Sequence, residues 1–414
     1  MLGSVLVIVA VTAACTPGLA PAPGLPFRDS SNGVHGTRGW FEGGQLWYGE
    51  FGDPHVIRDG STYYAYASPV AGRYLPVLTS TDLVTWRIHR GWSTNGPPGR
   101  SGYSVAADAS IPAEIRAQPM SEWDRYDLND GQARAPQWGL DDGGTWLRRA
   151  AWAPGVTKIG STWFSYSAIR VSFASDDPHG FGRFCLTAAS SASPIGPFRD
   201  TSGAAPIQCQ PASTDPAGSI DPFPFVDDGA ANQPYLLWKA AGKVGSRPSS
   251  LLSVPLGSNG KPIPGRAPIK LLDTNEGGWE GSTIENPAMI RYGNRYYLFY
   301  SGNYSGVLDA SGRSQYATGY AICPQGPRAP CQRQTVGSPL LASTPTEQGP
   351  GGASPVIDTN GALRLAYAFY WPGENRTELT AEHSRHPRRM NVATLVVRSD
   401  GTLTAVRRAW KPQA

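Results

Sequence analysis

Three carboxylates stand at similar places in a sequence pattern that recurs along the chain. Asp53 and Asp221 each directly precede a proline, and Glu285 begins the sequence Glu285-Asn286-Pro287. One aspartate before proline can simply cap a turn, but three carboxylates in one repeat favour a shared site. Carboxylates that converge repel one another, which raises the pKa of at least one of them. Two carboxyl groups with different pKa values are what acid–base hydrolysis of a glycosidic bond requires.

The repeat that carries these residues consists of a polar residue and a proline, an apolar stretch, a glycine-containing turn and an aromatic strand. We align its five copies on Pro54, Pro154, Pro222, Pro287 and Pro355, and the residues at the head of the copies are Asp53, Ala153, Asp221, Glu285 and Ser354. Each copy predicts two strands joined by a tight turn, and each interval leaves room for two more. The pattern predicts an all-β fold, a five-bladed β-propeller whose heads meet at the mouth of a central channel. A β-sandwich with accidental sequence similarity is the alternative.

The composition agrees with an all-β protein rich in turns. The chain has 414 residues with 49 Gly, 38 Pro, 13 Trp and 18 Tyr, and 16% of its residues are charged. So many aromatic residues exclude global disorder, and so few charges argue against coiled coils. The net charge of +4 is not gathered into a basic run, so we expect no nucleic-acid partner.

The first interval of the repeat is 100 residues long, against 65 to 68 for the others. We therefore place an insertion near residues 92–144 within a catalytic domain that spans residues 28–414. Its aromatic residues could wall off one side of the channel.

The N-terminus predicts export. Residues 2–14 are almost wholly apolar, too short for a membrane span of about 20 residues but suited to a signal peptide. The sequence up to Cys15 resembles a bacterial lipobox, although Thr12 is unusual there and no Lys or Arg precedes the apolar run. We expect residues 1–15 to be a signal peptide with lipidation at Cys15, and residues 16–27 to be a Pro/Gly-rich linker. The protein would then be an extracellular lipoprotein at the cell surface. The lipid anchor would be its only attachment to the membrane. Plain secretion and an intracellular location are the alternatives.

Four cysteines remain after Cys15, an even number that favours two disulfides in an exported chain. Pairing between sequence neighbours joins Cys185 to Cys209 and Cys323 to Cys331, which is one of three possible connectivities. Four reduced cysteines are the alternative. No CxxC spacing occurs, so we expect no zinc site.

Six motifs in order resemble glycoside hydrolase family 43, which contains arabinanases, α-L-arabinofuranosidases, β-xylosidases and some galactosidases. The motifs are Phe51-Gly52-Asp53-Pro54, Ser80-Thr81-Asp82-Leu83-Val84-Thr85-Trp86, Trp152-Ala153-Pro154-Gly155-Val156, Ser193-Pro194-Ile195-Gly196-Pro197-Phe198, Ser219-Ile220-Asp221-Pro222 and Ile284-Glu285-Asn286-Pro287. The resemblance implies a five-bladed propeller and an inverting hydrolase.

The resemblance also implies roles for individual residues. Asp53 matches the general base that activates water, Glu285 the general acid, and Asp221 the carboxylate that tunes and orients the acid. An inverting mechanism asks for an acid and a base about 6.5–9.5 Å apart, which leaves room for water. Trp152 matches an aromatic residue that stacks on sugar.

We predict further substrate contacts, and for these residues a purely structural role is the alternative. Trp279 lies shortly before the fourth head, and Phe173 and Arg389 could also reach the site. His55 should lie near the channel by strand alternation, although a histidine there can equally be a hydrogen-bonded core residue.

The sequence departs from the family at the expected centre of the channel. Relatives carry Gly-Pro-Gly-His in the fifth blade, and the histidine helps to hold a central calcium. This chain reads Gly349-Pro350-Gly351-Gly352, and the aligned Tyr367 is followed by alanine instead of a second histidine. We therefore expect no required cofactor and no metal ligands, and the sequence argues against the central calcium.

Together these features predict an exported, monomeric, inverting glycosidase that cleaves arabinofuranosyl- or xylosyl-containing oligo- or polysaccharides, with exo action favoured. The alternatives are an inactive carbohydrate-binding propeller, a β-galactoside or galactofuranoside hydrolase of the same fold, and a structural protein of the cell surface. A retaining fructan-cleaving propeller is a further alternative, but its Asn-Asp-Pro-Asn-Gly motif is absent.

Overall fold

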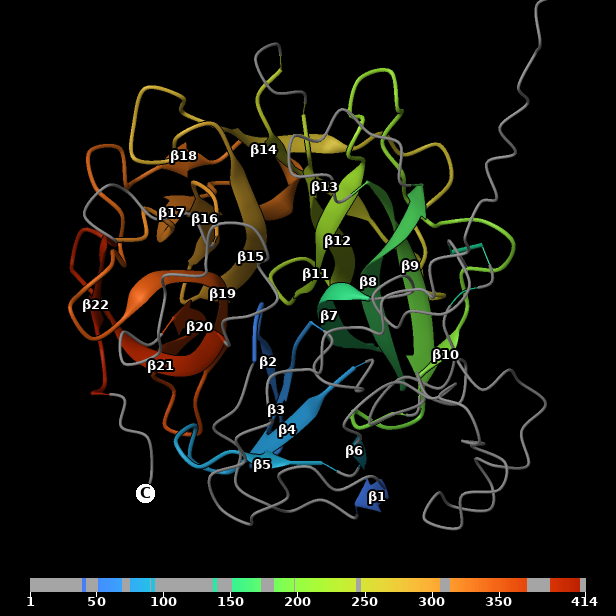
Figure 1. Ribbon diagram of the computed structural model, residues 1–414, viewed down its shortest axis with the longest axis horizontal. Coiled ribbons are helices and arrows are strands. Elements are labelled where there is room, and N and C mark those ends of the chain that lie inside the picture. The colour runs from blue at the N-terminus through green and yellow to red at the C-terminus, as the bar shows by residue number, and fades with distance from the viewer. Residues whose placement is uncertain are drawn as a thin grey trace, which may run out of the picture.

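Five four-stranded antiparallel sheets make up the molecule. The computed structural model describes residues 39–41, 51–68, 75–89, 91–93, 136, 138–139, 151–172, 182–196, 198–242, 247–305, 313–370 and 388–409. Each four-stranded sheet uses four strands that follow one another in the sequence. Figure 1 shows the sheets arranged around a common centre. The predicted all-β class and five-bladed β-propeller are confirmed.

The blades follow the chain in order. Blade one contains β2 (His55–Asp59), β3 (Thr62–Tyr66), β4 (Val77–Ser80) and β5 (Arg87–Ile88). Blade two contains β7 (Trp152–Ile159), β8 (Thr162–Ser172), β9 (Arg183–Ser191) and β10 (Arg199–Asp200). Blade three contains β11 (Ser219–Asp227), β12 (Gln233–Ala240), β13 (Ser250–Pro255) and β14 (Ile269–Asp273). Blade four contains β15 (Ile284–Tyr292), β16 (Arg295–Gly302), β17 (Ala317–Ile322) and β18 (Gln332–Arg333), with the 3-10 turn η2 (Gly326–Arg328) between its last two strands. Blade five contains β19 (Gln348–Ile357), β20 (Leu363–Tyr370), β21 (Arg388–Val397) and β22 (Leu403–Val406), and a separate two-stranded sheet pairs β1 (Gly39–Phe41) with β6 (Gly91–Ser93).

The first strand of every blade lies at the centre. Each of these strands contacts the first strand of the next blade, in the order β2, β7, β11, β15 and β19. Strand β19 contacts β2 in turn, so the five first strands form a closed ring. Blade one comes entirely from the N-terminal part of the chain and blade five from the C-terminal part. The seam between them is closed by hydrogen bonds, among them Val56 N to Ser354 Oγ at 2.9 Å and Thr359 N to the hydroxyl of Tyr63 at 2.8 Å.

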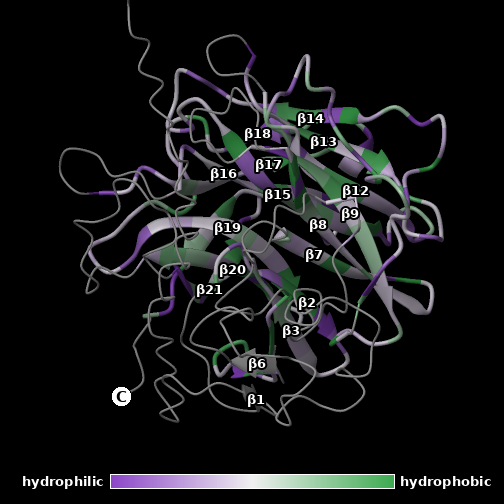
Figure 2. Ribbon diagram, turned by 45° about the vertical axis from the view of Figure 1, so that its right-hand side comes forward, coloured by the Kyte–Doolittle hydropathy of each residue, from purple (hydrophilic) through white to green (hydrophobic). Residues whose placement is uncertain are grey.

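Hydrophobic packing lies between the blades, because each sheet has neighbours on both faces. Five buried clusters occur, and each joins two adjacent blades. Strand β16 shows the principle. Its residues Tyr296, Leu298 and Tyr300 pack towards blade three, whereas Tyr297 and Phe299 pack towards blade five. Figure 2 accordingly shows hydrophobic segments along the strands and hydrophilic segments in the connecting loops.

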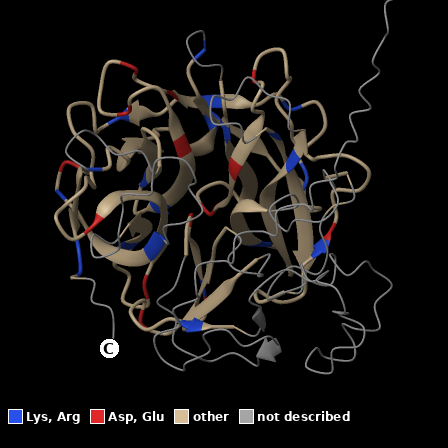
Figure 3. Ribbon diagram, in the orientation of Figure 1, with Lys and Arg blue, Asp and Glu red and all other residues tan. Residues whose placement is uncertain are grey.

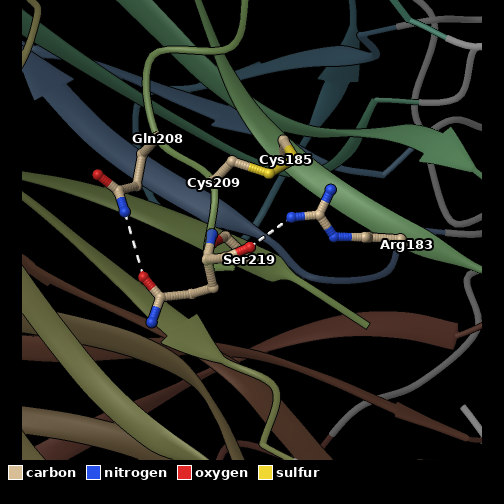
Figure 4. Close-up of a disulfide and its surroundings, with 6 residues drawn as sticks. Arg183, Cys185, Gln208, Cys209 and Ser219 are labelled. Atoms are coloured by element: carbon tan, nitrogen blue, oxygen red, sulfur yellow. Dashed lines mark hydrogen bonds between the residues drawn. A yellow bond between two sulfur atoms is a disulfide. The ribbon is translucent and has the colours of Figure 1, made fainter. Parts of the chain in front are cut away.

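The structure pairs Cys185 with Cys209 and Cys323 with Cys331, the pairing between sequence neighbours. Figure 4 shows the first disulfide joining β9 to the loop that leads into β11. In that loop the backbone N–H of Gln210 donates to Ser219 Oγ at 2.9 Å. Blade two is therefore tied covalently to the segment just before the inner strand of blade three.

Several parts of the predicted organisation lie outside the described residues. They include the signal peptide with Cys15, the linker at residues 16–27 and most of the insertion near residues 92–144. Trp138, near the end of that insertion, is described, and its indole N–H donates to Ser202 Oγ at 2.7 Å. Within the described part of the chain, no helix has the length and apolarity needed to cross a bilayer.

Candidate active site

A positive-φ residue near the start of each inner strand places the candidate catalytic residues. At equivalent positions it is Asp53 (52°), Ala153 (43°), Asp221 (56°), Asn286 (50°) and Gly352 (60°), and blade five has a second positive-φ glycine nearby, Gly349. In blades two to five the strand register shifts at this point. A bulge re-aims the local side chains, and non-glycine residues at positive φ are strained, which is typical of functional positions.

This geometry corrects the predicted alignment of the blade heads. Asn286, not Glu285, is the equivalent of Asp53 and Asp221, because it is the positive-φ residue before the proline. Glu285 stands one residue earlier, as Trp152 does in blade two. In blade five the equivalent residue is Gly352, two positions before the predicted head Ser354. Alignment on proline misplaced this head because Pro355 lies three residues after Gly352, whereas in the other blades the proline directly follows the positive-φ residue.

Asp53 is held by contacts from two blades. Arg388 of β21 donates to both of its carboxylate oxygens, with Nη1–Oδ1 at 2.6 Å and Nη2–Oδ2 at 2.9 Å. Ser68 adds a hydrogen bond to Oδ2 at 2.7 Å, and Ser68 Oγ in turn accepts from the backbone N–H of Ala153 at 2.9 Å. A Cβ on Gly52 would overlap the Arg388 guanidinium, so only glycine leaves room for this contact. The carboxylate is therefore fixed in one orientation.

Glu285 is held on both of its carboxyl oxygens. Lys239 Nζ lies 3.0 Å from Oε2, and the Tyr316 hydroxyl lies 2.7 Å from Oε1. Burial, then the charges of Glu285 and Asp53, raise the pKa of Tyr316 well above its usual value, so the phenol is a neutral donor. Its one proton is shared between Glu285 Oε1 and Asn286 Oδ1, which is also 2.7 Å away. A Cβ on Gly351 would overlap the Tyr316 ring, so glycine is needed there as well.

Asp221 is the most deeply placed of the three carboxylates, with 8% of its surface exposed. Burial and the nearby Glu285 charge raise the pKa of Asp221 to about 8, although Lys239 acts in the opposite direction. Its Oδ2 accepts a hydrogen bond from the backbone N–H of Asn286 at 2.9 Å. Asp221 therefore holds its proton more tightly than an exposed aspartate does, and it touches the residue that follows Glu285.

The three carboxylates belong to one connected cluster. The charge of Asp53 contributes to the raised pKa of both Asp221 and Tyr316. Gly352 lies against Asp53, and a Cβ there would be 3.1 Å from Asp53 Cα. Figure 3 shows acidic and basic segments together near the centre of the ring. The predicted convergence of Asp53, Asp221 and Glu285 is thus what the structure has.

The residues at this centre do not fit a calcium site. Gly352 stands where the family pattern has its histidine, and its positive φ and a Cβ only 3.1 Å from Asp53 Cα would strain any side chain there. Within the described residues no three His, Cys, Asp or Glu side chains are grouped so that they could hold a metal ion.

Trp152 remains the best candidate for sugar stacking. It occupies in blade two the bulge position that Glu285 occupies in blade four. Its ring is half-buried and stacks on Phe184, with centroids 4.4 Å apart, and Arg170 lies over both rings. Phe173, also predicted to bind substrate, lies outside the described residues.

Two predicted substrate ligands are packing residues instead. His55 is buried, and its Nε2 hydrogen-bonds to the carbonyl of Val156 in the next blade at 2.8 Å. Burial lowers the pKa of His55 to about 4, so it is neutral and donates to that carbonyl. Trp279 donates its indole N–H to the carbonyl of Thr335 at 2.6 Å and stacks on Tyr300. The polar atoms of both side chains hydrogen-bond to backbone carbonyls of neighbouring segments, so these side chains help to hold the propeller together.

Arg389, predicted as a substrate contact, is buried at 6% exposure, whereas its neighbour Arg388 contacts Asp53. The two side chains differ because successive strand residues point to opposite faces. Sequence reasoning also missed Lys239 and Tyr316. Lys239 left a usable signal, because it is a lone charge in the otherwise apolar end of Gln233–Ala240.

Comparisons with known proteins agree with the geometry. The sequence matches the family described as "Glycosyl hydrolases family 43" over residues 132–402, about two thirds of the chain. Asp53 precedes this region, and its place rests on the structure. No curated protein matches the sequence.

Solved structures of the same architecture cover nearly the whole chain. A thermostable family-43 glycoside hydrolase has a TM-score of 0.59 at 22% identity, covering 93% of this chain and 98% of its own. An endo-1,4-β-xylanase from Bacteroides thetaiotaomicron VPI-5482 has a TM-score of 0.57 at 19% identity, covering 88% and 97%. An α-L-arabinofuranosidase from Lactobacillus brevis has a TM-score of 0.57 at 16% identity, also covering 88% and 97%. The fold is shared with these proteins, and the family match over residues 132–402 establishes that the chain belongs to glycosyl hydrolase family 43 and is a glycosidase.

Proposed function

We propose that the protein is an exported, inverting glycosidase that removes arabinofuranosyl or xylosyl residues from glycans, mainly from chain ends. The observation that carries this proposal is the cluster of three carboxylates with unequal surroundings. Asp53 is bound by an arginine and a serine, Glu285 by a lysine and a tyrosine, and Asp221 is nearly buried. Such differences allow one carboxyl group to act as an acid while another acts as a base.

The proposed reaction assigns one proton transfer to each end of the cluster. Asp53, fixed by Arg388, accepts a proton from the attacking water. Glu285 gives a proton to the departing glycosidic oxygen, so that the bond breaks without releasing an alkoxide. Attack from the face opposite the leaving group inverts the anomeric carbon. Asp221 supports Glu285 through the hydrogen bond that it accepts from the backbone N–H of Asn286, the residue after Glu285.

The sugar is proposed from the chemistry named for structural relatives. They include an α-L-arabinofuranosidase, an exo-1,5-α-L-arabinanase and an arabinanase solved with arabinohexaose. Endo-acting and xylan-active proteins share the fold too, so xylosyl substrates stay in the proposal. Glycine at position 352, where the family pattern has a metal-binding histidine, supports a reaction that needs no cofactor.

Export is proposed from the N-terminal apolar run and from the two disulfides, which persist in oxidising compartments. Lipidation at Cys15 would hold the enzyme at the cell surface, and we propose that it acts there as a monomer. Labelling cells with a palmitate analogue and comparing the wild type with Cys15→Ser tests the anchor.

A panel of aryl α-L-arabinofuranoside, β-D-xyloside and β-D-galactoside substrates tests the activity, with proton NMR detection of the first anomer released. We expect hydrolysis of the arabinofuranoside or the xyloside with inverted configuration. A retained anomer would overturn the mechanism, and cleavage of the galactoside alone would overturn the sugar. Linear arabino-oligosaccharides then separate exo from endo action, because exo cleavage shortens the chain one residue at a time.

A further inference from the structure

Tyr316 is a buried phenol that touches two consecutive residues of the site at once. It directly precedes β17, and 3% of its surface is exposed. Its hydroxyl oxygen lies 2.7 Å from Glu285 Oε1 and 2.7 Å from Asn286 Oδ1. A phenol has one proton, so it donates to only one of these two oxygens at a time. The carboxyl group and the amide therefore compete for a single donor.

The charge on Glu285 decides which oxygen receives the phenol proton. A hydrogen bond to an ionised carboxylate is about twice as strong as one to a neutral group. A neutral Glu285 is the weaker acceptor, which leaves the phenol proton to the amide oxygen of Asn286. Once Glu285 has given its own proton to the leaving oxygen, the carboxylate attracts the O–H. This change needs only a rotation of the O–H bond, because both acceptors already lie within hydrogen-bond distance.

Blade five holds Tyr316 in this place. Its inner strand β19 passes beside the phenol ring, and a Cβ on Gly351 would lie 2.1 Å from a ring carbon. The backbone N–H of Tyr316 donates to Ser314 Oγ at 3.2 Å, and the N–H of Ser314 donates to Gln348 Oε1 at 3.1 Å. The hydroxyl is therefore aimed at Glu285 before any charge develops there, which is the condition for electrostatic stabilisation without reorganisation.

We propose that Tyr316 is a positioning residue that orients the carboxyl group of Glu285 and stabilises it as an anion while it gives up its proton. This rests on the function proposed above, in which Glu285 is the acid. The proton passes from Glu285 to the glycosidic oxygen, and the phenol keeps its own. Because this hydrogen bond strengthens only as charge develops on Glu285, it raises kcat and leaves the binding of sugar unchanged. Blade five then supports both proton transfers, through Tyr316 beside the acid and Arg388 beside the base.

Tyr316→Phe tests the proposal because it removes the hydroxyl and keeps the ring. We expect kcat for a methyl glycoside, which has a poor leaving group, to fall by about 10- to 100-fold. The nitrophenyl glycoside of the same sugar should lose far less, with KM little changed for both. Tyr297→Phe is the matched control, because this phenol is also buried and donates one hydrogen bond, to the Gly401 carbonyl at 3.0 Å. Gly351→Ala, which displaces the ring and keeps the hydroxyl, should give the same pattern, and it takes over the test if Tyr316→Phe does not fold.

Fluorine NMR tests the contact with Glu285 in the absence of substrate. In protein grown with meta-fluorotyrosine, the signal that disappears in Tyr316→Phe belongs to Tyr316. We expect this signal to move in Glu285→Gln, because the acceptor of the phenol proton changes. It should stay in place in Asp228→Asn, since 64% of the Asp228 side chain is exposed and Asp228 pairs with Arg291 instead.

Three results would overturn the proposal. Equal losses of kcat on the methyl and nitrophenyl glycosides would reduce Tyr316 to a general support of the fold. A raised KM with an unchanged kcat would make it a sugar ligand. A fluorine signal that does not respond to Glu285→Gln would remove the contact itself. If the wild type cleaves no glycoside, the proposed function fails, while the fluorine signal still decides whether Tyr316 is bonded to Glu285.

Discussion

Arg388 and Asp53 are 335 positions apart in the sequence, and two hydrogen bonds join their side chains. Arg388 Nη1 lies 2.6 Å from Asp53 Oδ1, and Nη2 lies 2.9 Å from Oδ2. Arg388 opens β21 of blade five, and Asp53 directly precedes β2 of blade one. The backbone reinforces the contact, because Phe51 N–H donates to the Arg388 carbonyl at 2.7 Å. The seam that closes the propeller therefore also orients the proposed base.

Gly52→Ala tests whether this contact matters for catalysis. The new methyl group would overlap the Arg388 guanidinium, which has to move away from Asp53. We expect kcat to fall at least tenfold, and the free energy of unfolding to fall by about 1–3 kcal/mol, as for other overpacked sites. Activity and urea unfolding are measured side by side. Gly277→Ala is the matched control, because a Cβ there meets nothing within 4 Å, and equal activity of the two variants would contradict the assignment.

Glu285→Gln tests the general acid through its leaving-group dependence. Poor leaving groups need protonation, so their kcat should fall by about 10²–10⁴-fold, whereas activated aryl glycosides should lose far less. Asp53→Asn is the comparison, because the loss of the base slows water attack on every substrate. Circular dichroism confirms folding, which is necessary since Lys239 loses its ion-pair partner in the first variant. Equal losses on both substrate classes would remove Glu285 from the acid role.

The propeller could be predicted from the sequence because its repeat reflects a physical requirement of each blade. Each blade has a positive-φ residue at the start of its inner strand, and proline directly follows that residue in four of the five blades: Pro54, Pro154, Pro222 and Pro287. Blade five meets the same requirement with Gly352 and Ala353, so alignment on proline misplaced its head. The candidate carboxylates could be predicted because Asp53 and Asp221 directly precede these prolines and Glu285 stands two residues before Pro287.

Contacts between distant blades could not be predicted from local sequence. Arg388 and Arg389 lie on opposite faces of β21, and local sequence does not show which of them faces the site. The pairing of β21 with β20 decides this, because it places Arg388 opposite Tyr370 and Arg389 opposite Phe369. Lys239 on β12 of blade three pairs with Glu285 on β15 of blade four, and Tyr316 reaches Glu285 from the segment just before β17 of blade four. His55 was misjudged for the same reason, because its partner, the Val156 carbonyl, lies 101 residues away.

Asp221→Asn should make the protein more stable at alkaline pH. Burial raises the pKa of Asp221 to about 8, above its ordinary value of 3.8. A carboxyl group whose pKa is higher in the folded state contributes its whole stabilising effect below its unfolded pKa, here about pH 4. That contribution to the free energy of unfolding is lost as the pH rises through the folded pKa of about 8. Asparagine keeps an oxygen for the Asn286 N–H and never ionises, so the variant should gain on the order of a few kcal/mol relative to the wild type between pH 5 and pH 9.

Urea unfolding at both pH values measures this gain. Asp228→Asn serves as the control, because 64% of the Asp228 side chain is exposed. The same pH dependence in the wild type and in Asp221→Asn would show that Asp221 is not protonated at neutral pH.

The two disulfides should differ in their effect on catalysis. Cys185 and Cys209 are separated by 24 residues, and the loop after Cys209 is hydrogen-bonded to Ser219, two residues before Asp221. Cys323 and Cys331 are separated by 8 residues and lie between β17 and β18, the two outer strands of blade four. Replacing either pair by alanine should lower the free energy of unfolding by about 3 kcal/mol or less, since both close short loops.

Only the Cys185→Ala/Cys209→Ala double variant should also lower kcat, by severalfold, because the start of β11 then loses its covalent link to blade two. Activity on an aryl glycoside, measured well below the melting temperature of each variant, separates this effect from unfolding. The Cys323→Ala/Cys331→Ala variant is the matched control. An equal loss of kcat in both would mean that neither disulfide acts through the start of β11, since the second disulfide joins the segments next to β17 and β18 in blade four.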